Sequence, residues 1–339
     1  MAEIAFGFGS SHGSLLVTRP EDWVGRAAAD RRNKALAFRG RTYAFDELDA
    51  LRKAEKFAQK STIEARRAQH ARCQENLDRL AETLDRVAPD VVLIVGDDQH
   101  EWFSEDVQPS YAVFCGDIVE SLATSEEEIA QHRAEGRLVD PLGYHPPSDA
   151  RYPVARGLAE HVITSALGDG FDVTACMRQP KEHGSTRPIN LGHAYGFIYR
   201  RILRDRPIPV VPILVNTFYP PNQPVPKRCV EFGRAIGRAI KSWPENKRVA
   251  VCASGGLSHF VVDEAFDRKI LGALERGDLR ALMDEPDAMF RSGTSETKNW
   301  LIAAGILAET DFRMTLLDYV PCYRSEAGTG NAMAFATWQ

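Results

Sequence analysis

The chain has 339 residues, of which 44% are hydrophobic and 26% are charged, and its 42 basic and 47 acidic residues give a net charge of -5. This composition excludes a disordered chain, and the absence of a strongly basic block favours neither a nucleic acid nor an anionic membrane as a partner. Apolar runs such as residues 91–95 are far shorter than the ~20 residues that cross a bilayer, and the first residues lack a signal-peptide pattern, so we expect a cytoplasmic protein.

The first predicted elements form a strand, a long helix and a second strand. Apolar residues 2–8 run into a Gly-Ser-rich stretch, which predicts a strand followed by a loop. Ser61 and Glu64 form a capping-box pattern, and apolar residues at helical spacing predict a helix from there to about Val87. Residues 90–98 are apolar and end in acids, which predicts a strand that is buried on both faces.

The alternation of helices and strands continues to the end of the chain. It predicts an α/β fold, a layered sandwich with a mostly parallel central sheet flanked by helices. We expect one domain over residues 1–339, in which the polar and weakly periodic residues 19–60 form a helical insertion near the mouth of the site. The further predicted helices cover residues 153–167, 191–203, 224–241, 261–275 and 296–306, and the further strands cover residues 171–176, 209–216 and 248–253.

The cysteines do not suggest a metal cluster or a disulfide framework. Six of them are scattered along the chain, and no two have the C-x-x-C spacing that such sites use. We therefore expect buried thiols at Cys73, Cys115, Cys176, Cys229, Cys252 and Cys322.

Histidines follow three of the predicted strands. Ligands of open α/β sheets bind beyond the carboxyl ends of the strands, and these ends carry His12, His100 and His259. Two imidazoles and one carboxylate on separate loops are what an open Fe(II) site requires. His12 supplies one candidate ligand, and the residues alone leave the second open among Asp98, His100 and Glu101.

Other interpretations of these loops are weaker. Residues 9–13 match the G-x-S-x-G pattern of a serine hydrolase, with Ser11 as the nucleophile, but the segment that follows does not look like the helix that such an elbow needs. Residues 254–256 could cradle a phosphate, although no Walker or G-x-G-x-x-G pattern accompanies them. Glu296 follows a predicted helix start, where it can be either a cap residue or a ligand.

Several long motifs, in order, resemble the class III extradiol ring-cleavage dioxygenases, whose members include the β subunit of protocatechuate 4,5-dioxygenase. The motifs are GFGSSHGSLL, PDVVLIVGDDQHEWF, GHAYGFIYRRI, PVVPILVNTFYPPNQPVPKRC, ASGGLSHFVVDE, GTSETKNWLIAAG and AGTGNAMAFATW. The insertion after the first motif further resembles the single-chain 3-O-methylgallate dioxygenase branch. The resemblance implies an Fe(II) enzyme that uses O2 to open the ring of a dihydroxylated or trihydroxylated aromatic acid of the 3-O-methylgallate, gallate or protocatechuate type. It also implies a homodimer, and a chain of this length is expected to need no small partner subunit.

The resemblance also implies roles for individual residues. His12 falls on the first iron-ligand histidine of the family, and Glu296 aligns with its carboxylate ligand. His193, in GHAYGF, falls on the histidine that acts as the acid/base, and His259 is expected near the site.

The second ligand is where this chain departs from the family pattern. The usual Asp-His pair is replaced by Asp98-Gln99-His100, so an ungapped alignment puts Gln99 at the ligand position and a one-residue shift puts His100 there. We favour His100, because imidazole is the better donor for Fe(II) and a bulge at a strand end can re-aim a side chain. Asp98 or Glu101 would then orient His100 through its other ring nitrogen. Because Gln99 is unusual at this position, a relative that keeps the fold but has lost the activity is a further alternative.

Recognition of a ring carboxylate calls for hydroxyl groups or a guanidinium, which pairs with a carboxylate at two points. The candidates are Thr217, Tyr323 and Arg324.

Overall fold

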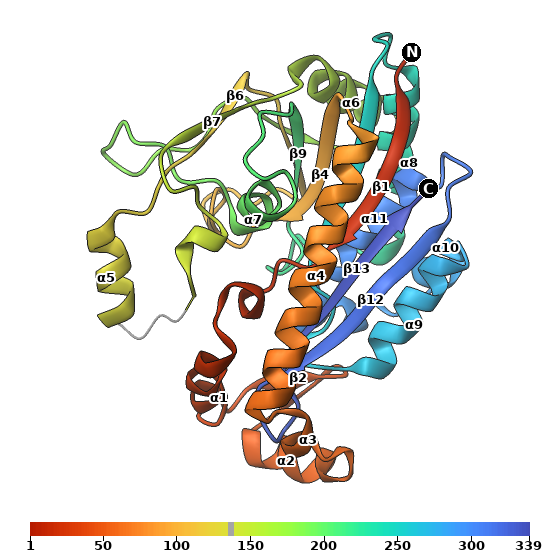
Figure 1. The fold of residues 1–339 in the computed structure, drawn as a ribbon. Helices are drawn as coiled ribbons and strands as arrows, with labels where there is room; N and C mark the ends of the chain where they lie inside the picture. The colour runs from red at the N-terminus through yellow and green to blue at the C-terminus, as the bar shows by residue number, and fades with distance from the viewer. Residues whose placement is uncertain (135–138) are drawn as a thin grey trace.

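The computed structural model describes residues 1–134 and 139–339. Its central feature is a sheet whose middle four strands are parallel (Figure 1). In spatial order these strands are β1 (Glu3–Ser10), β10 (Arg248–Ser254), β4 (Val91–Asp97) and β9 (Val210–Val215). Their carboxyl ends therefore lie along one edge, where the loops that follow them meet.

Antiparallel pairs extend this parallel centre on both sides, so that the sheet has nine strands within the described residues. Beyond β9, the strand β5 runs antiparallel to it and pairs with β8; beyond β1, the long β13 runs antiparallel to β1, β11 and β12. The added strands are β5 (Tyr111–Phe114), β8 (Thr174–Cys176), β11 (His259–Val261), β12 (Met314–Tyr323) and β13 (Thr329–Trp338).

Helices cover both faces of the sheet, as Figure 1 shows. The side chains of β4 explain the two layers, because they alternate between the two cores. Leu93 packs into the core formed with α6, α8 and α11, whereas Ile94 packs into the core formed with α4 and α7. The helices are α4 (Ile63–Val87), α6 (Arg156–Gly168), α7 (His193–Arg201), α8 (Pro226–Ser242), α9 (Glu264–Glu275), α10 (Leu279–Met283) and α11 (Thr297–Leu307).

Close packing of α8 against α11 fixes the position of the residue before α11, which is Glu296. A Cβ atom added at Gly233 would lie 2.1 Å from the carbonyl oxygen of Ile302, and one added at Gly305 would lie 2.3 Å from that of Val230. Only glycine allows the two backbones to approach this closely.

The α/β sandwich is confirmed, and the insertion differs from its prediction. Residues 19–60 contain α1 (Trp23–Asp30), α2 (Phe45–Arg52) and α3 (Phe57–Lys60), but also a β-hairpin of β2 (Leu36–Phe38) and β3 (Arg41–Tyr43). The segment is thus mainly helical but also contains this hairpin, which the sequence did not predict. Leu36 on the hairpin and Phe45 and Leu48 on α2 bury their side chains against Val261, which gives the insertion a small core of its own.

Local details also differ. The long helix α4 begins one residue later than the pattern suggested, because Thr62 rather than Ser61 accepts the hydrogen bond from the backbone of Ala65. The helix predicted from residue 261 begins at Glu264, since residues 259–261 form β11. Outside the main sheet, β6 (Ile118–Ser121) pairs with β7 (Ala150–Pro153), and α5 (Glu126–Ala134) follows β6.

All six cysteines are buried and free, as expected. Among the described residues, no helix is both long enough and apolar enough to cross a membrane.

Candidate active site

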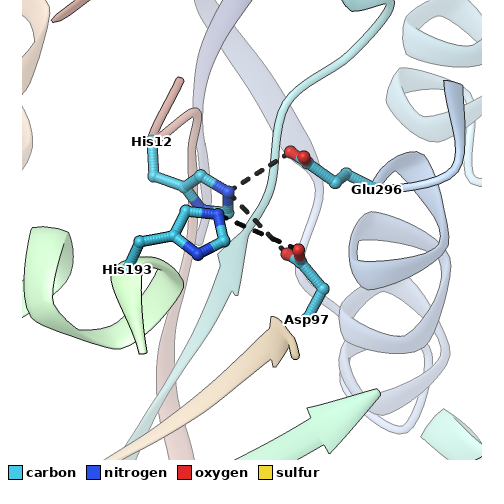
Figure 2. Close-up of side chains that lie close together, drawn as sticks. All are labelled: His12, Asp97, His193 and Glu296. Atoms are coloured by element: carbon cyan, nitrogen blue, oxygen red, sulfur yellow. Dashed lines mark ion pairs between the residues drawn. The ribbon is translucent and has the colours of Figure 1, made fainter. Parts of the chain in front are cut away.

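Four side chains converge at the carboxyl edge of the parallel strands (Figure 2). His12 follows β1, Asp97 is the last residue of β4, His193 is the first residue of α7, and Glu296 directly precedes α11. One ligand atom from each lies within 4.8 Å of those of the others. In Figure 2 the two imidazoles face the two carboxylates across a common centre. We call these four residues the deep cluster.

Hydrogen bonds fix the orientation of the His12 ring. The hydroxyl of Ser254 donates its only proton to the carbonyl oxygen of Ala194, so it must accept a proton from Nδ1 of His12, 2.9 Å away. This bond turns the other ring nitrogen, Nε2, toward the deep cluster, and Nε2 carries no proton when the ring is neutral. This atom is buried and has no hydrogen-bond partner, and it lies 3.3 Å from Glu296 Oε2 and 3.7 Å from Asp97 Oδ1.

Glu296 is held in place by backbone and side-chain donors. Its Oε2 accepts a hydrogen bond of 2.6 Å from the backbone N–H of Gly256. Burial alone would raise the pKa of Glu296, but His259 and His12 outweigh burial and hold this pKa below its usual value. The carboxylate is therefore ionised, and its Oε2 lies close to Nε2 of His12.

Asp97 is fully buried, and it is the second carboxylate of the deep cluster. Its Oδ1 accepts a hydrogen bond of 3.0 Å from Asn299 on α11. Burial raises the pKa of Asp97, and repulsion from Glu296 raises it further. Two buried carboxylates that face one point call for a cation between them.

Gln99 bridges these two carboxylates. Its Nε2 donates to Asp97 Oδ2 at 3.0 Å and to Glu296 Oε1 at 3.1 Å. An amide has two donor hydrogens on this nitrogen, so both bonds can form at once. The contacts explain how a neutral residue fits among charged ones: Gln99 orients the carboxylates rather than adding a charge.

His193 forms a pair with Glu101. The backbone N–H of His193 donates to Glu101 Oε1 at 2.7 Å, and Nδ1 lies 2.9 Å from the same oxygen, which leaves Nε2 facing Asp97 at 4.0 Å. Burial alone would raise the pKa of Glu101, but His193 lowers it to about 2. Burial alone would lower the pKa of His193, but Glu101 raises it to about 10. The arrangement is that of a histidine oriented and stabilised as a cation by a carboxylate.

His100 lies outside the deep cluster. Its backbone has a positive φ of 60°, and its ring stacks on Tyr219 with 3.5 Å between centroids, while Nε2 lies 3.0 Å from the amide nitrogen of Gln108. This backbone conformation turns His100 away, and the side chain that reaches Asp97 is that of Gln99. The expectation that His100 is oriented by Asp98 or Glu101 does not match their contacts. Asp98 accepts hydrogen bonds from the backbone of residues 102 and 103, and Glu101 binds His193.

His259 and Arg324 lie at the site, whereas two other candidates do not. His259 Nε2 lies 3.5 Å from Glu296 Oε1. Tyr323 donates its hydroxyl proton to Glu264, and Thr217 is fully buried with its carbonyl oxygen accepting from Lys298; neither lines the cavity described next.

A cavity of about 390 Å³ opens onto the deep cluster. Its inner wall carries His12, Glu296 and His193, and its outer wall carries Tyr144, Phe260 and two arginines. The complete lining is His12, Gly13, Ser14, Arg26, Gln99, Glu101, Val139, Tyr144, His193, His259, Phe260, Glu296, Arg324 and Asn331.

The hydrolase interpretation has no support in the contacts of Ser11. This side chain is fully buried, and its hydroxyl oxygen accepts a hydrogen bond of 3.0 Å from the backbone N–H of Ala334. Among the described residues no histidine is hydrogen-bonded to Ser11, and His12 is bonded instead to Ser254.

Comparison with known proteins agrees with the geometry. A family model described as the catalytic LigB subunit of aromatic ring-opening dioxygenase matches residues 59–329, well over half of the chain. The chain belongs to this family. The match confirms the resemblance in the sequence motifs, and it covers Asp97, His193 and Glu296 of the deep cluster.

The individual relatives share only a modest fraction of identical residues with this chain. Gallate dioxygenase of Pseudomonas putida is 28% identical over 48% of this chain and 49% of its own length. A 2,3-dihydroxyphenylpropionate/2,3-dihydroxicinnamic acid 1,2-dioxygenase of Burkholderia vietnamiensis is 26% identical over 72% of this chain and 84% of its own length. A second enzyme of that name from Pseudomonas putida is 32% identical over 55% of this chain and 51% of its own length. The chain thus spans about half the length of two of these three relatives.

Sequence reasoning missed three residues of the site. Asp97 was assigned to the end of a strand and was not considered as a ligand, although it directly precedes the Asp98-Gln99-His100 segment. Arg26 lies in the insertion that was expected near the mouth of the site, but nothing in the sequence singled it out, and Tyr144 lies in a segment with no distinctive motif.

Proposed function

We propose that this protein is a non-haem Fe(II) extradiol dioxygenase, which uses O2 to cleave the ring of an aromatic acid with two or three adjacent hydroxyl groups. The observation that carries the proposal is the deep cluster. It offers His12 Nε2, which has no hydrogen-bond partner, and two buried carboxylates at one point beside a cavity large enough for a single aromatic ring. Family membership supports the same chemistry.

His12, Asp97 and Glu296 would hold the metal. Imidazole nitrogen and carboxylate oxygen are both ligands that Fe(II) accepts, and the ion would balance the two buried negative charges. When bound, Fe(II) would supply the redox chemistry between O2 and the hydroxylated ring. In this ligand set Asp97 takes the place of His100, which the sequence suggested as the second ligand. The identity of the second ligand stays a prediction.

Gln99, Asn299 and Gly256 would keep the ligands aligned. Each donates to a carboxylate oxygen of Asp97 or Glu296, and such outer hydrogen bonds are typically worth ~10–100-fold in metal affinity.

His193 would act as the acid/base. A cation held by Asp97 and Glu296 would oppose the effect of Glu101 on the pKa of His193 and favour the neutral ring. The Nδ1–H bond to Glu101 leaves Nε2 on the cavity wall, where the neutral ring can take a proton from a phenolic hydroxyl of the bound ring. Glu101 then stabilises the imidazolium that forms, and His193 can return the proton later in the reaction. His259, on the other side of Glu296, would line the binding site for the ring.

The proposal is tested by anaerobic loading of the apoprotein with Fe(II), and in parallel with Mn(II), followed by oxygen-electrode measurements. The panel is gallate, 3-O-methylgallate, protocatechuate and catechol. We expect Fe(II)-dependent oxygen uptake with at least one of these, and incorporation of both atoms of labelled O2 into a ring-opened product. Undiminished activity after exhaustive chelation, or no uptake with any member of the panel, would contradict the proposal, and the second result would favour an inactive relative.

A further inference from the structure

We propose that Arg26 is the residue that binds the carboxylate of the aromatic substrate, and that the insertion thereby makes the site selective for aromatic acids. Arg26 lies on α1 of the insertion and lines the same cavity as His12, His193 and Glu296. The inference deepens the proposed function and rests on it for the identity of the ring.

The cleft around Arg26 has an inner and an outer part. The inner part is the cavity at the deep cluster, and the outer part is a second cavity of about 620 Å³. Arg26, Tyr144, Phe260 and Arg324 line both, so the two parts share a wall. A ring whose hydroxyl groups face His12 would direct a substituent on its far side toward this shared wall.

Of the two arginines on the shared wall, Arg324 is already neutralised. Its Nε and Nη2 donate to the two carboxylate oxygens of Asp30, and its Nη1 donates to Asn331 Oδ1 at 3.2 Å. The Arg324 side chain is 5% exposed, so water has little access to this ion pair. Arg324, which the sequence suggested as the carboxylate ligand, has its two-point face occupied by a carboxylate of the protein.

Arg26 has no such partner. Within the part of the chain that the structure describes, no ion pair or hydrogen bond is formed by its guanidinium, although the residue is half-buried. Burial lowers the pKa of Arg26, and the neighbouring Arg324 lowers it further. A partly desolvated guanidinium whose donors have no partner is a site that an anion would stabilise.

A carboxylate on a ring fits this site better than other anions would. The planar guanidinium matches a carboxylate at two points, and the walls beside it carry the aromatic rings of Tyr144 and Phe260. Phe260 is 41% exposed and has a positive φ of 63°, an unusual conformation for a bulky residue that presents its ring at the cleft. The aromatic walls and the cation together favour an apolar ring that carries one negative charge.

The test compares ligands with and without the carboxylate. Binding of 4-hydroxybenzoate and of phenol is measured by calorimetry, and kcat/KM is measured on protocatechuate and on catechol with the Fe(II)-loaded enzyme. We expect Arg26→Gln to weaken 4-hydroxybenzoate binding by ~10–100-fold and to lower the protocatechuate-to-catechol ratio of kcat/KM by a similar factor, as the loss of a charged two-point bond would. Arg26→Lys should recover part of the ratio.

Arg19→Gln is the matched control, because Arg19 lies in the same insertion but is 81% exposed and paired with Asp22. It should leave both measurements unchanged, and thermal melting checks that each variant is folded. If Arg26→Gln keeps the binding constant and the ratio within twofold of the original protein, or if Arg19→Gln loses as much, the inference is overturned. If no substrate is turned over but 4-hydroxybenzoate binding still depends on Arg26, the proposed function fails and the carboxylate site stands.

Discussion

The inner and outer walls of the cleft are built in opposite ways. On the inner wall the carboxylates and His193 are held by hydrogen bonds from neighbouring residues. Glu296 accepts from Gly256 and Gln99, and His193 is bonded to Glu101. These residues lie at the ends of sheet strands or at helix starts. The outer wall carries an unpartnered cation and a strongly exposed aromatic ring, and part of it comes from the insertion.

The difference separates chemistry from selectivity. A rigid inner wall suits groups whose relative positions decide a reaction, since small displacements there are costly. On the outer wall, the unpartnered guanidinium of Arg26 is available to bind a ligand. Changes on the inner wall should therefore affect metal binding and turnover with every substrate, whereas changes on the outer wall should alter the ratio between substrates.

The largest effect is expected for Glu296→Gln. The amide keeps the size of the side chain but removes the charge that faces His12, and its nitrogen would oppose the N–H of Gly256 or the amide of Gln99. Metal affinity should fall by more than the ~10–100-fold that follows from loss of an outer hydrogen bond. Metal analysis after dialysis measures this, and full retention of metal would remove Glu296 from the ligand set.

The second effect is expected for His193→Ala, which should lower kcat by ~10²–10⁴-fold while leaving metal content nearly unchanged. The reason is that Nδ1 of His193 is taken by Glu101 and only Nε2 faces the cavity. If the variant instead loses its metal, His193 is a fourth ligand. Glu101→Gln should show a smaller loss of kcat in the same assay, because the imidazole remains.

A smaller effect is expected for Gln99→Ala. The substitution removes the donor shared by Asp97 and Glu296, so metal affinity should drop by ~10–100-fold without being abolished. Anaerobic titration with Fe(II) measures the change. A variant that binds no metal at all would mean that Gln99 is itself a ligand, as an ungapped alignment with the family suggests.

The smallest effect is expected for His100→Ala. Loss of its stacking on Tyr219 should lower the free energy of unfolding by ~0.5–1.5 kcal/mol, while the metal affinity stays unchanged. Chemical denaturation and the same Fe(II) titration measure the two quantities. Loss of metal from this variant would restore the ligand set expected from the sequence.

Much of the inner wall could be predicted from the sequence, and the physical reason is the parallel sheet. His12 and the segment after residue 97 follow recognisable strands, and strand ends gather at one edge whatever the details of packing. The direction of each side chain beyond the strand could not be predicted in the same way. It depends on single backbone angles, such as the positive φ of His100, which turns that ring toward Tyr219 and lets Gln99 reach the cluster.

The outer wall was less predictable, because its properties depend on pairings between distant residues. Arg324 and Arg26 are equivalent as letters in a sequence. Only the fold brings Asp30 to Arg324, 294 residues away, and leaves Arg26 without a partner. The antiparallel hairpin of β12 and β13 was missed for a different reason: it is a local pairing that follows the last predicted helix and departs from the alternation of helices and strands on which the other strands were predicted.

His12, Asp97 and Glu296 are the residues that we propose to hold one divalent iron. The most direct test is anaerobic calorimetry of the apoprotein with Fe(II), in which the original protein is compared with Asp97→Asn and His100→Ala. We expect one Fe(II) per chain for the original protein and for His100→Ala, and a loss of at least ~100-fold in affinity for Asp97→Asn. Unchanged affinity in Asp97→Asn together with loss of iron in His100→Ala would show that this ligand set is wrong.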